Sequence, residues 1–160
     1  MIISIASDHA GFDQKKELAA YLVSEGYEVI DRGPENDDRV DYPDFAAAVA
    51  HDVSDGTADR GVLVCGTGIG MALAADKVVG CRAANVINVQ FAELCRQHND
   101  ANIITLSGRF VELDVNKQIV DTFLTTKFEG GRHAMRVAKI MKLDADGNAH
   151  IGADGNVRRA

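Results

Sequence analysis

Along most of the chain, short continuous apolar runs alternate with stretches in which apolar residues recur every three or four positions. The continuous runs are rich in branched side chains and are bounded by glycine or polar residues, which is typical of buried strands. These predicted strands are 2–7, 27–31, 61–65, 81–86 and 103–107. The helical spacing is clear in Leu18 and Leu22, and again in Phe45, Val49 and Val53.

The segments with helical spacing lie between the predicted strands. The expected helices are 12–24, 45–53, 71–77, 90–98 and 111–123, with one more after Gly130-Gly131. Strands that alternate with helices imply a parallel sheet with helices on both faces. Residues 144–160 are polar and turn-rich, with Asp-Gly-Asn at both 146–148 and 154–156. We therefore expect one α/β domain over 1–143 and a C-terminal tail over 144–160.

Composition and charge narrow the range of partners. The chain has 160 residues, which suits one domain, and its net charge of −7 argues against binding to nucleic acid or an anionic membrane. Its three cysteines are odd in number and lack C-x-x-C spacing, so neither a disulfide framework nor a zinc site is indicated. The start of the chain lacks the features of a signal peptide, and no apolar run is long enough to span a membrane. We expect a cytoplasmic protein.

The segment from Val62 to Gly70 joins a predicted strand to a thiol and a glycine-rich turn. It reads Val-Leu-Val-Cys-Gly-Thr-Gly-Ile-Gly. Alternate glycines let the backbone turn tightly and bring its N–H groups close to an anion. The helix expected from Met71 places its positive N-terminus at the same point. Such a setting favours the thiolate form of Cys65 beside an anion hole, which suggests chemistry rather than binding alone.

Other polar clusters follow the first and fifth predicted strands. Ser7-Asp8-His9-Ala10-Gly11 follows the first strand, and Ser107-Gly108-Arg109 follows the fifth. Open parallel sheets bind ligands beyond the carboxyl ends of their strands. We therefore expect these clusters to converge on one sheet edge with Cys65–Gly70, together with Gln97-His98-Asn99-Asp100 at a helix end. Arg132 and Arg136, four positions apart, share one helix face and suit a phosphate.

Each cluster also has a purely structural interpretation. A cysteine at a strand end is more often an inert core residue, and Asp8 before a helix is most simply an N-cap. His98 can merely favour a helix C-terminus, and the two arginines can form a solvated face. The glycine spacing is not that of a dinucleotide fingerprint, and no carboxylate lies within 83–90 to bind a ribose. The expected convergence of these clusters on one sheet edge is what favours the functional interpretation over the structural one.

Five motifs lie in order along the chain, within a match that runs from the first residue to about Leu143. They are Ser7-Asp8-His9-Ala10-Gly11, Asp41-Tyr42-Pro43, Cys65-Gly66-Thr67-Gly68-Ile69-Gly70, Arg96-Gln97-His98-Asn99-Asp100-Ala101-Asn102 and Glu129-Gly130-Gly131-Arg132-His133. Together they resemble ribose-5-phosphate isomerase type B, a family that includes the galactose-6-phosphate isomerase subunits. The resemblance implies a Rossmann-like three-layer α/β/α fold with a five-stranded parallel sheet. It also implies a homodimer or a dimer of dimers, an active site at the dimer interface, and no metal or other cofactor.

The resemblance further implies roles for single residues. Asp8 and His98 would open the sugar ring, with His98 able to reach in from the partner subunit. Cys65 would move a proton between C1 and C2 through an enediolate, whose oxygen Thr67 and the loop amides would stabilise. Some members use a later glutamate, but residues 74–76 are Ala-Ala-Asp, so Cys65 is the matching base. The implied substrate-binding residues are His9, Tyr42, Gly66, Gly68, Ile69, Gly70, Asn99, Arg109, Arg132 and Arg136.

These roles predict a metal-independent aldose–ketose isomerase that interconverts ribose 5-phosphate and ribulose 5-phosphate. One alternative is an isomerase of a six-carbon aldose 6-phosphate, such as allose or galactose 6-phosphate. Another is a non-catalytic regulator that binds a sugar phosphate. The joint presence of Cys65, Asp8 and His98 argues against the regulator, because a pure binder needs only the phosphate clamp.

Overall fold

A five-stranded parallel sheet forms the centre of the protein. The computed structural model describes residues 1–146, 149–151 and 157–159. The strands run in the spatial order β2-β1-β3-β5-β4, and every neighbouring pair is parallel. Their bounds are β1 (Ile2–Ser7), β2 (Glu28–Asp31), β3 (Arg60–Cys65), β4 (Ala83–Asn85) and β5 (Ile103–Ser107). The predicted α/β fold with five parallel strands is confirmed.

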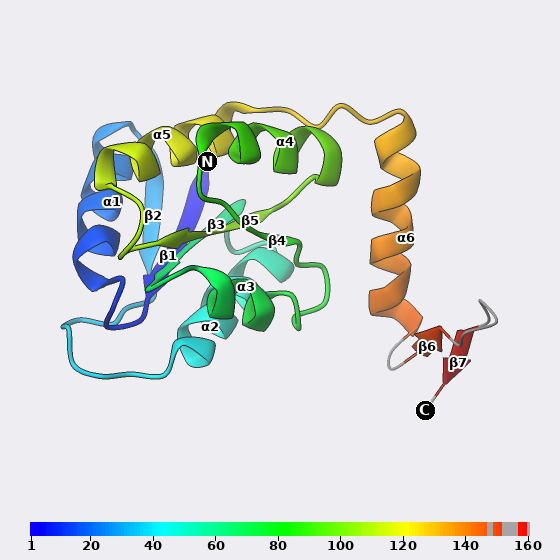
Figure 1. The fold of residues 1–160 in the computed structure, drawn as a ribbon, viewed down its shortest axis with the longest axis horizontal. Coiled ribbons are helices and arrows are strands. Elements are labelled where there is room, and N and C mark those ends of the chain that lie inside the picture. Colours follow the sequence, from blue (N-terminus) through cyan, green and yellow to red (C-terminus); the bar gives the residue numbers. More distant parts are fainter. Residues whose placement is uncertain (147–148, 152–156, 160) are drawn as a thin grey trace.

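Helices cover both faces of this sheet, which gives three layers (Figure 1). One face carries α1 (Phe12–Ser24), α4 (Val89–Asn99) and α5 (Leu113–Thr125). The other carries α2 (Tyr42–Ser54) and α3 (Ile69–Ala75). Crossovers between parallel strands are right-handed. The face that a connecting helix covers therefore depends on whether the next strand is added on one side of the previous strand or on the other.

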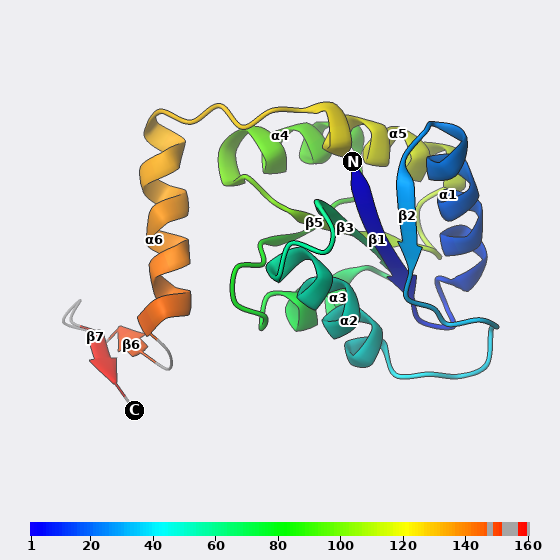
Figure 2. The same ribbon diagram turned by 180° about the vertical axis from the view of Figure 1, so that it is seen from behind.

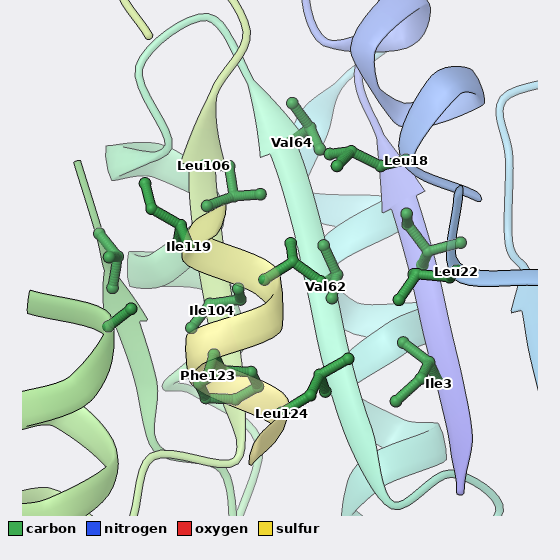
Figure 3. Close-up of a cluster of buried hydrophobic side chains, with 14 of the residues drawn as sticks. Ile3, Leu18, Leu22, Val62, Val64, Ile104, Leu106, Ile119, Phe123 and Leu124 are labelled. Carbon is green, nitrogen blue, oxygen red and sulfur yellow. The ribbon is translucent and has the colours of Figure 1, made fainter. Parts of the chain in front are cut away.

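The two buried clusters explain why the strands read as continuous apolar runs. Val62 and Val64 of β3 point into the cluster beneath α1 and α5, where Phe123 is fully buried (Figure 3). Leu63 and Cys65, their neighbours along the strand, point into the cluster beneath α2 and α3. Successive strand side chains face opposite ways, so a strand buried on both faces has no polar alternation.

Several helices and strands begin or end at residues other than those that the apolar periodicity predicts. The helix expected from Phe45 begins at Tyr42, because Asp41 is extended and Pro43 suits the first turn of a helix. The helix expected from Met71 begins at Ile69, directly after Gly68, which has a left-handed backbone with φ +83°. The strand expected over 81–86 pairs with β5 only at Ala83–Asn85.

The last helix, α6 (Arg132–Asp146), stands beside the layers (Figures 1 and 2). The helix continues to Asp146, past the expected boundary at Leu143, and Asp144 accepts a hydrogen bond from the backbone N–H of Gly80 at 2.9 Å. Beyond it, β6 (Ala149–Ile151) and β7 (Val157–Arg159) pair antiparallel, where only turns were expected. Most of the two Asp-Gly-Asn copies lie outside the described residues. Of the described helices, none has the length and apolarity needed to cross a membrane.

Candidate active site

The candidate site lies where the chain reverses its direction of strand addition. β1 and β3 are neighbours in the sheet, β2 lies outside β1, and β5 lies beyond β3. Loops at the carboxyl ends of strands on either side of such a switch point leave a crevice that binds ligands in open α/β sheets. Asp8 directly follows β1, and Gly66 directly follows β3. The topology therefore brings together the polar cluster that follows β1 and the glycine-rich turn that follows β3.

Cys65 ends β3 with its side chain almost fully buried, at 5% exposure. Its Sγ accepts a hydrogen bond from the backbone N–H of Gly68 at 3.1 Å. The thiols of Cys81 and Cys95 instead donate to backbone carbonyls, and burial raises the pKa of both to about 11. Cys65 therefore differs from them in receiving a backbone N–H on its sulfur.

The glycine loop is held in place by contacts that leave no room for side chains. A Cβ on Gly68 would lie 2.7 Å from Oδ1 of Asn85, and one on Gly70 would lie 2.8 Å from the ring of Tyr42. The backbone N–H of Gly108, after β5, donates to the carbonyl of Cys65 at 2.7 Å. These contacts confine the loop and place the half-exposed Tyr42 against it.

Arg109 and Ser107 join the same loop from the end of β5. The Arg109 side chain packs against Gly66, with its guanidinium group within about 4 Å of the position that a Cβ there would take. The Ser107 hydroxyl donates to the carbonyl of Gly66 at 2.8 Å. A cation therefore lies beside the loop that carries the thiol.

Asp8 is a buried carboxylate that closes the turn between β1 and α1. Its Oδ1 accepts from the backbone N–H of Ala10 at 2.9 Å and of Gly11 at 3.0 Å. The N-cap of α1 is Gly11, so the simple N-cap interpretation of Asp8 is wrong. Both of these hydrogen bonds are made to Oδ1 and neither to Oδ2. His9, beside it, lies with Nδ1 3.3 Å from the carbonyl of Val40.

His98 does not lie at this edge. It belongs to the last turn of α4, and the chain then enters β5 at Ile103, which pairs in register with Gly61 at the start of β3. Cys65 lies at the opposite end of β3, where it pairs with Ser107. The expectation that all clusters converge on one edge within a chain is therefore wrong. A motif at the end of a crossover helix lies at the amino ends of the strands, because that helix runs antiparallel to them.

The arginines expected to bind phosphate lie with His98, not with Cys65. Arg132 and Arg136 are exposed in the first turns of α6. His133, between them, is buried and stacks on His98, with ring centroids 4.2 Å apart and planes 5° from parallel. Desolvation lowers the pKa of His133, and so do the neighbouring His98 and Arg132. The exposed Asn99 follows His98 at the end of α4.

Some motif residues hold the structure together, and His133 packs against His98, neither of which the residue pattern predicts. Asp100 has a left-handed backbone and pairs with Arg96 at 2.8 Å and with Arg82 at 3.0 Å. These residues of the 96–102 motif thus fix the corner that carries His98. The His98–His133 stack joins distant positions of the chain, and its only signal in the sequence is a histidine directly after Gly-Gly-Arg.

A thiol beside a confined glycine loop, at the switch point of a doubly wound sheet, defines an α/β protein that handles small anionic ligands. Residues 3–140 match the Ribose/Galactose Isomerase family, and the chain belongs to that family. It is 44% identical over 142 residues to ribose-5-phosphate isomerase B of Escherichia coli, covering 89% of this chain and 95% of the relative. It is 46% identical over 146 residues to a probable ribose-5-phosphate isomerase B of Mycoplasma genitalium, with 90% and 96% covered.

Solved structures of similar proteins share the fold. Ribose-5-phosphate isomerase B of Clostridium thermocellum superposes with a TM-score of 0.89 at 50% identity, covering 91% of this chain and 98% of that one. The enzyme from Mycoplasma genitalium, crystallised with bound ribulose 5-phosphate, superposes with a TM-score of 0.88 at 45% identity. That comparison covers 91% of this chain and 97% of the other.

Proposed function

We propose that the protein is an aldose–ketose isomerase that interconverts ribose 5-phosphate and ribulose 5-phosphate. The observation that carries the proposal is Cys65, held at the end of β3 with Gly68 N–H on its sulfur, in a chain of the Ribose/Galactose Isomerase family. The relative that was crystallised with ribulose 5-phosphate supports this pentose phosphate as the ligand.

The reaction begins with ring opening, because aldose phosphates exist mainly as rings. Asp8, through Oδ2, and His98 form the acid–base pair for this step. One takes the proton from the anomeric hydroxyl while the other delivers a proton to the ring oxygen, so the number of protons is conserved. The partner that delivers the proton enters the step protonated and the other enters it with a free lone pair, and the two exchange these states in the reverse reaction.

The open-chain sugar then passes through an enediolate. The Cys65 thiolate removes the proton from C2 of the aldose and returns it to C1, while a proton moves from the C2 hydroxyl to the C1 oxygen. Backbone N–H groups of the loop from Gly66 to Gly70 stabilise the negative oxygen, with the Thr67 hydroxyl beside them. Preorganised donors suit this task, since the contacts around Gly68 and Gly70 prevent the loop from relaxing.

The substrate phosphate is bound by side chains on either side of the site. Arg109 and His9 approach from the Cys65 edge, and Arg132 and Arg136 from α6. Tyr42 and Asn99 contact the sugar hydroxyls, and Ile69 lines the loop. An arginine–phosphate pair is charge-assisted and can be bidentate, which suits a dianion held by an acidic protein.

The division of the site between two edges supports a homodimer with shared active sites. Cys65 and Asp8 stand at the carboxyl ends of the strands, whereas His98 and the α6 arginines stand near the amino ends. A two-fold related copy can bring the second set to the first. The surface around the Cys65 edge also favours a partner, because large apolar side chains are exposed there, and Phe110 reaches 78% exposure. The others are Ile69, Ile87 and Phe91, which line an open hollow of about 490 Å³.

The proposal extends to assembly, location and the tail. The dimer can pair further into a dimer of dimers, and the protein works in the cytoplasm. Residues 1–143 carry the isomerase function, and the 144–160 tail takes no part in the chemistry. A chain that ends after Asp146 keeps the bond from Gly80 to Asp144 and should keep its turnover within a few-fold.

Comparative turnover tests the substrate class. Purified protein is assayed with ribose 5-phosphate, allose 6-phosphate and galactose 6-phosphate, each with and without a chelator. We expect the highest kcat/KM for ribose 5-phosphate, and we expect the chelator to leave it unchanged. Faster turnover of a six-carbon phosphate would favour the first alternative, and binding of all three without turnover would favour the regulator.

A further inference from the structure

His98 belongs to a group of three potential metal ligands, although the isomerase reaction proposed above does not require a metal. Together with Glu129 and His133 it offers two imidazole nitrogens and one carboxylate oxygen, all within 4.8 Å of one another. In the described part of the chain this is the only such group of three. Two histidines and a carboxylate form a ligand set that zinc and neighbouring transition metals prefer, with water completing the coordination.

The backbone fixes the elements that carry these three side chains. The N–H of Glu129 donates to the carbonyl of Gln97 at 3.1 Å, which ties the segment before α6 to the last turn of α4. The N–H of His133 donates to the carbonyl of Gly130 at 2.9 Å, which closes the first turn of α6. The positions of the ligands therefore depend on folded elements rather than on mobile side chains alone.

The Glu129–His133 pair is already close to the spacing of metal ligands, whereas His98 must reorient. Donor atoms around a tetrahedral zinc ion lie roughly 3.3 Å apart, as follows from metal–ligand distances near 2 Å. Oε2 of Glu129 already lies 3.5 Å from Nε2 of His133, and the Glu129 side chain is half exposed, so it can follow the ion. The stacked ring of His98 must tilt, because the nitrogens of parallel rings point past a shared ion rather than toward it.

Arg132 opposes the binding of a metal ion and thereby limits which ions can bind. Its Nε lies 3.3 Å from Nε2 of His133, so an ion on that nitrogen displaces the arginine. Arg136, one turn further along α6, adds a second positive charge. These cations exclude weakly bound hard ions such as Mg²⁺, which gain little from imidazole. An ion that bonds strongly to imidazole overcomes the repulsion.

We propose that His98, Glu129 and His133 form a binding site for a divalent transition-metal ion that inhibits the protein. Binding of the ion takes up the lone pair of His98 and moves Arg132. The inhibition, unlike the binding, rests on the proposed function, in which His98 opens the sugar ring and Arg132 holds the phosphate. The ion is thus an inhibitor that competes with the sugar phosphate, not a cofactor.

Titration with Ni²⁺ in phosphate-free buffer tests the binding directly. The titrated protein carries Cys65→Ala, which removes the thiol that could bind the metal instead. We expect one Ni²⁺ per chain. Because even an outer partner of a metal ligand is worth ten- to a hundredfold in affinity, Glu129→Gln and His133→Gln should each weaken binding by about tenfold or more. Glu17→Gln, an exposed glutamate on α1, is the matched control and should not change it. Equal binding in all variants would overturn the site.

Inhibition is measured separately, on protein with Cys65 intact. Ni²⁺ should lower the turnover of ribose 5-phosphate, a chelator should restore it, and more substrate should relieve it. Glu129→Gln should keep its turnover without metal and should require about tenfold more Ni²⁺ for the same inhibition. Wild-type turnover unaffected at Ni²⁺ concentrations that saturate the titration would overturn the inhibitory role. An absence of turnover in metal-free protein would count against the isomerase function and would leave the binding result intact.

Discussion

Gly68 offers a perturbation whose size can be worked out from the structure. Its backbone has φ +83°, so an alanine there is strained by roughly 1–2 kcal/mol. Its Cβ would also lie 2.7 Å from Oδ1 of the Asn85 side chain, which is a clash, and 3.1 Å from the backbone carbonyl oxygen of Thr105, which is a tight contact. Overpacking of this kind costs about 1–3 kcal/mol. Gly68→Ala should therefore lower the free energy of unfolding by about 2–5 kcal/mol.

Gly26 provides the matched control. It has nearly the same backbone, with φ +86°, but a Cβ there would meet no atom within 4 Å. Gly26→Ala should lower the free energy of unfolding by only about 1–2 kcal/mol, and it should leave turnover unchanged because Gly26 lies after α1, far from the glycine loop. The difference between the two variants isolates the effect of the clash.

The clash should also reach the chemistry. The Gly68 N–H donates to the Cys65 sulfur, so a loop displaced to admit the Cβ loses that bond and shifts its other donors. A displacement near 1 Å can lower turnover by about a hundredfold. Urea unfolding measures the stability of both variants, and turnover of ribose 5-phosphate measures the chemistry. Gly68→Ala with turnover like that of Gly26→Ala would refute the role given to the loop.

Three further predictions use other groups. At pH 8 only about one in a thousand thiols with a pKa near 11 is ionised, so iodoacetamide should leave Cys81 and Cys95 of the native protein almost unmodified. Mass spectrometry of the peptides measures this, and rapid modification of either would contradict it. Burial would raise the pKa of Asp52, but hydrogen bonds from Arg32 and Ser4 outweigh it and lower that pKa. The stability that wild type gains over Asp52→Asn should therefore be full at pH 7 and shrink below about pH 4, as urea unfolding at both pH values would show; a constant difference would contradict this. Arg136→Ala should raise KM for ribose 5-phosphate about ten- to a hundredfold with less effect on kcat, and an unchanged KM would remove Arg136 from the site.

Much of the fold follows from local pattern, because a strand buried on both faces and a helix packed on one leave different spacings of apolar residues. The continuous apolar run of a strand buried on both faces is seen in residues 62–65, and the spacing of a helix packed on one face is seen in the leucines of α1. The order of the strands is not local: β5 lies between β3 and β4, and nothing in the apolar runs shows this. The start of α2 depended on Pro43 rather than on periodicity.

The candidate site was only half accessible from sequence. The glycine spacing and the thiol identified the loop after β3, because that loop is continuous in the chain. The place of His98 required the direction of its helix relative to the sheet, and its stack with His133 required the packing of α6. These are relations between distant segments, so residue types alone could not supply them.

Mixing two inactive variants tests the shared active site most directly. Cys65→Ala and His98→Asn subunits are unfolded together in equal amounts and refolded, and turnover of ribose 5-phosphate is compared with that of each variant treated alone. In a two-fold symmetric dimer, half of the molecules are then hybrids with one intact site, so about a quarter of wild-type turnover should return. If Cys65 and His98 act within one chain, the mixture would show no more turnover than the two variants apart, and the account would be contradicted.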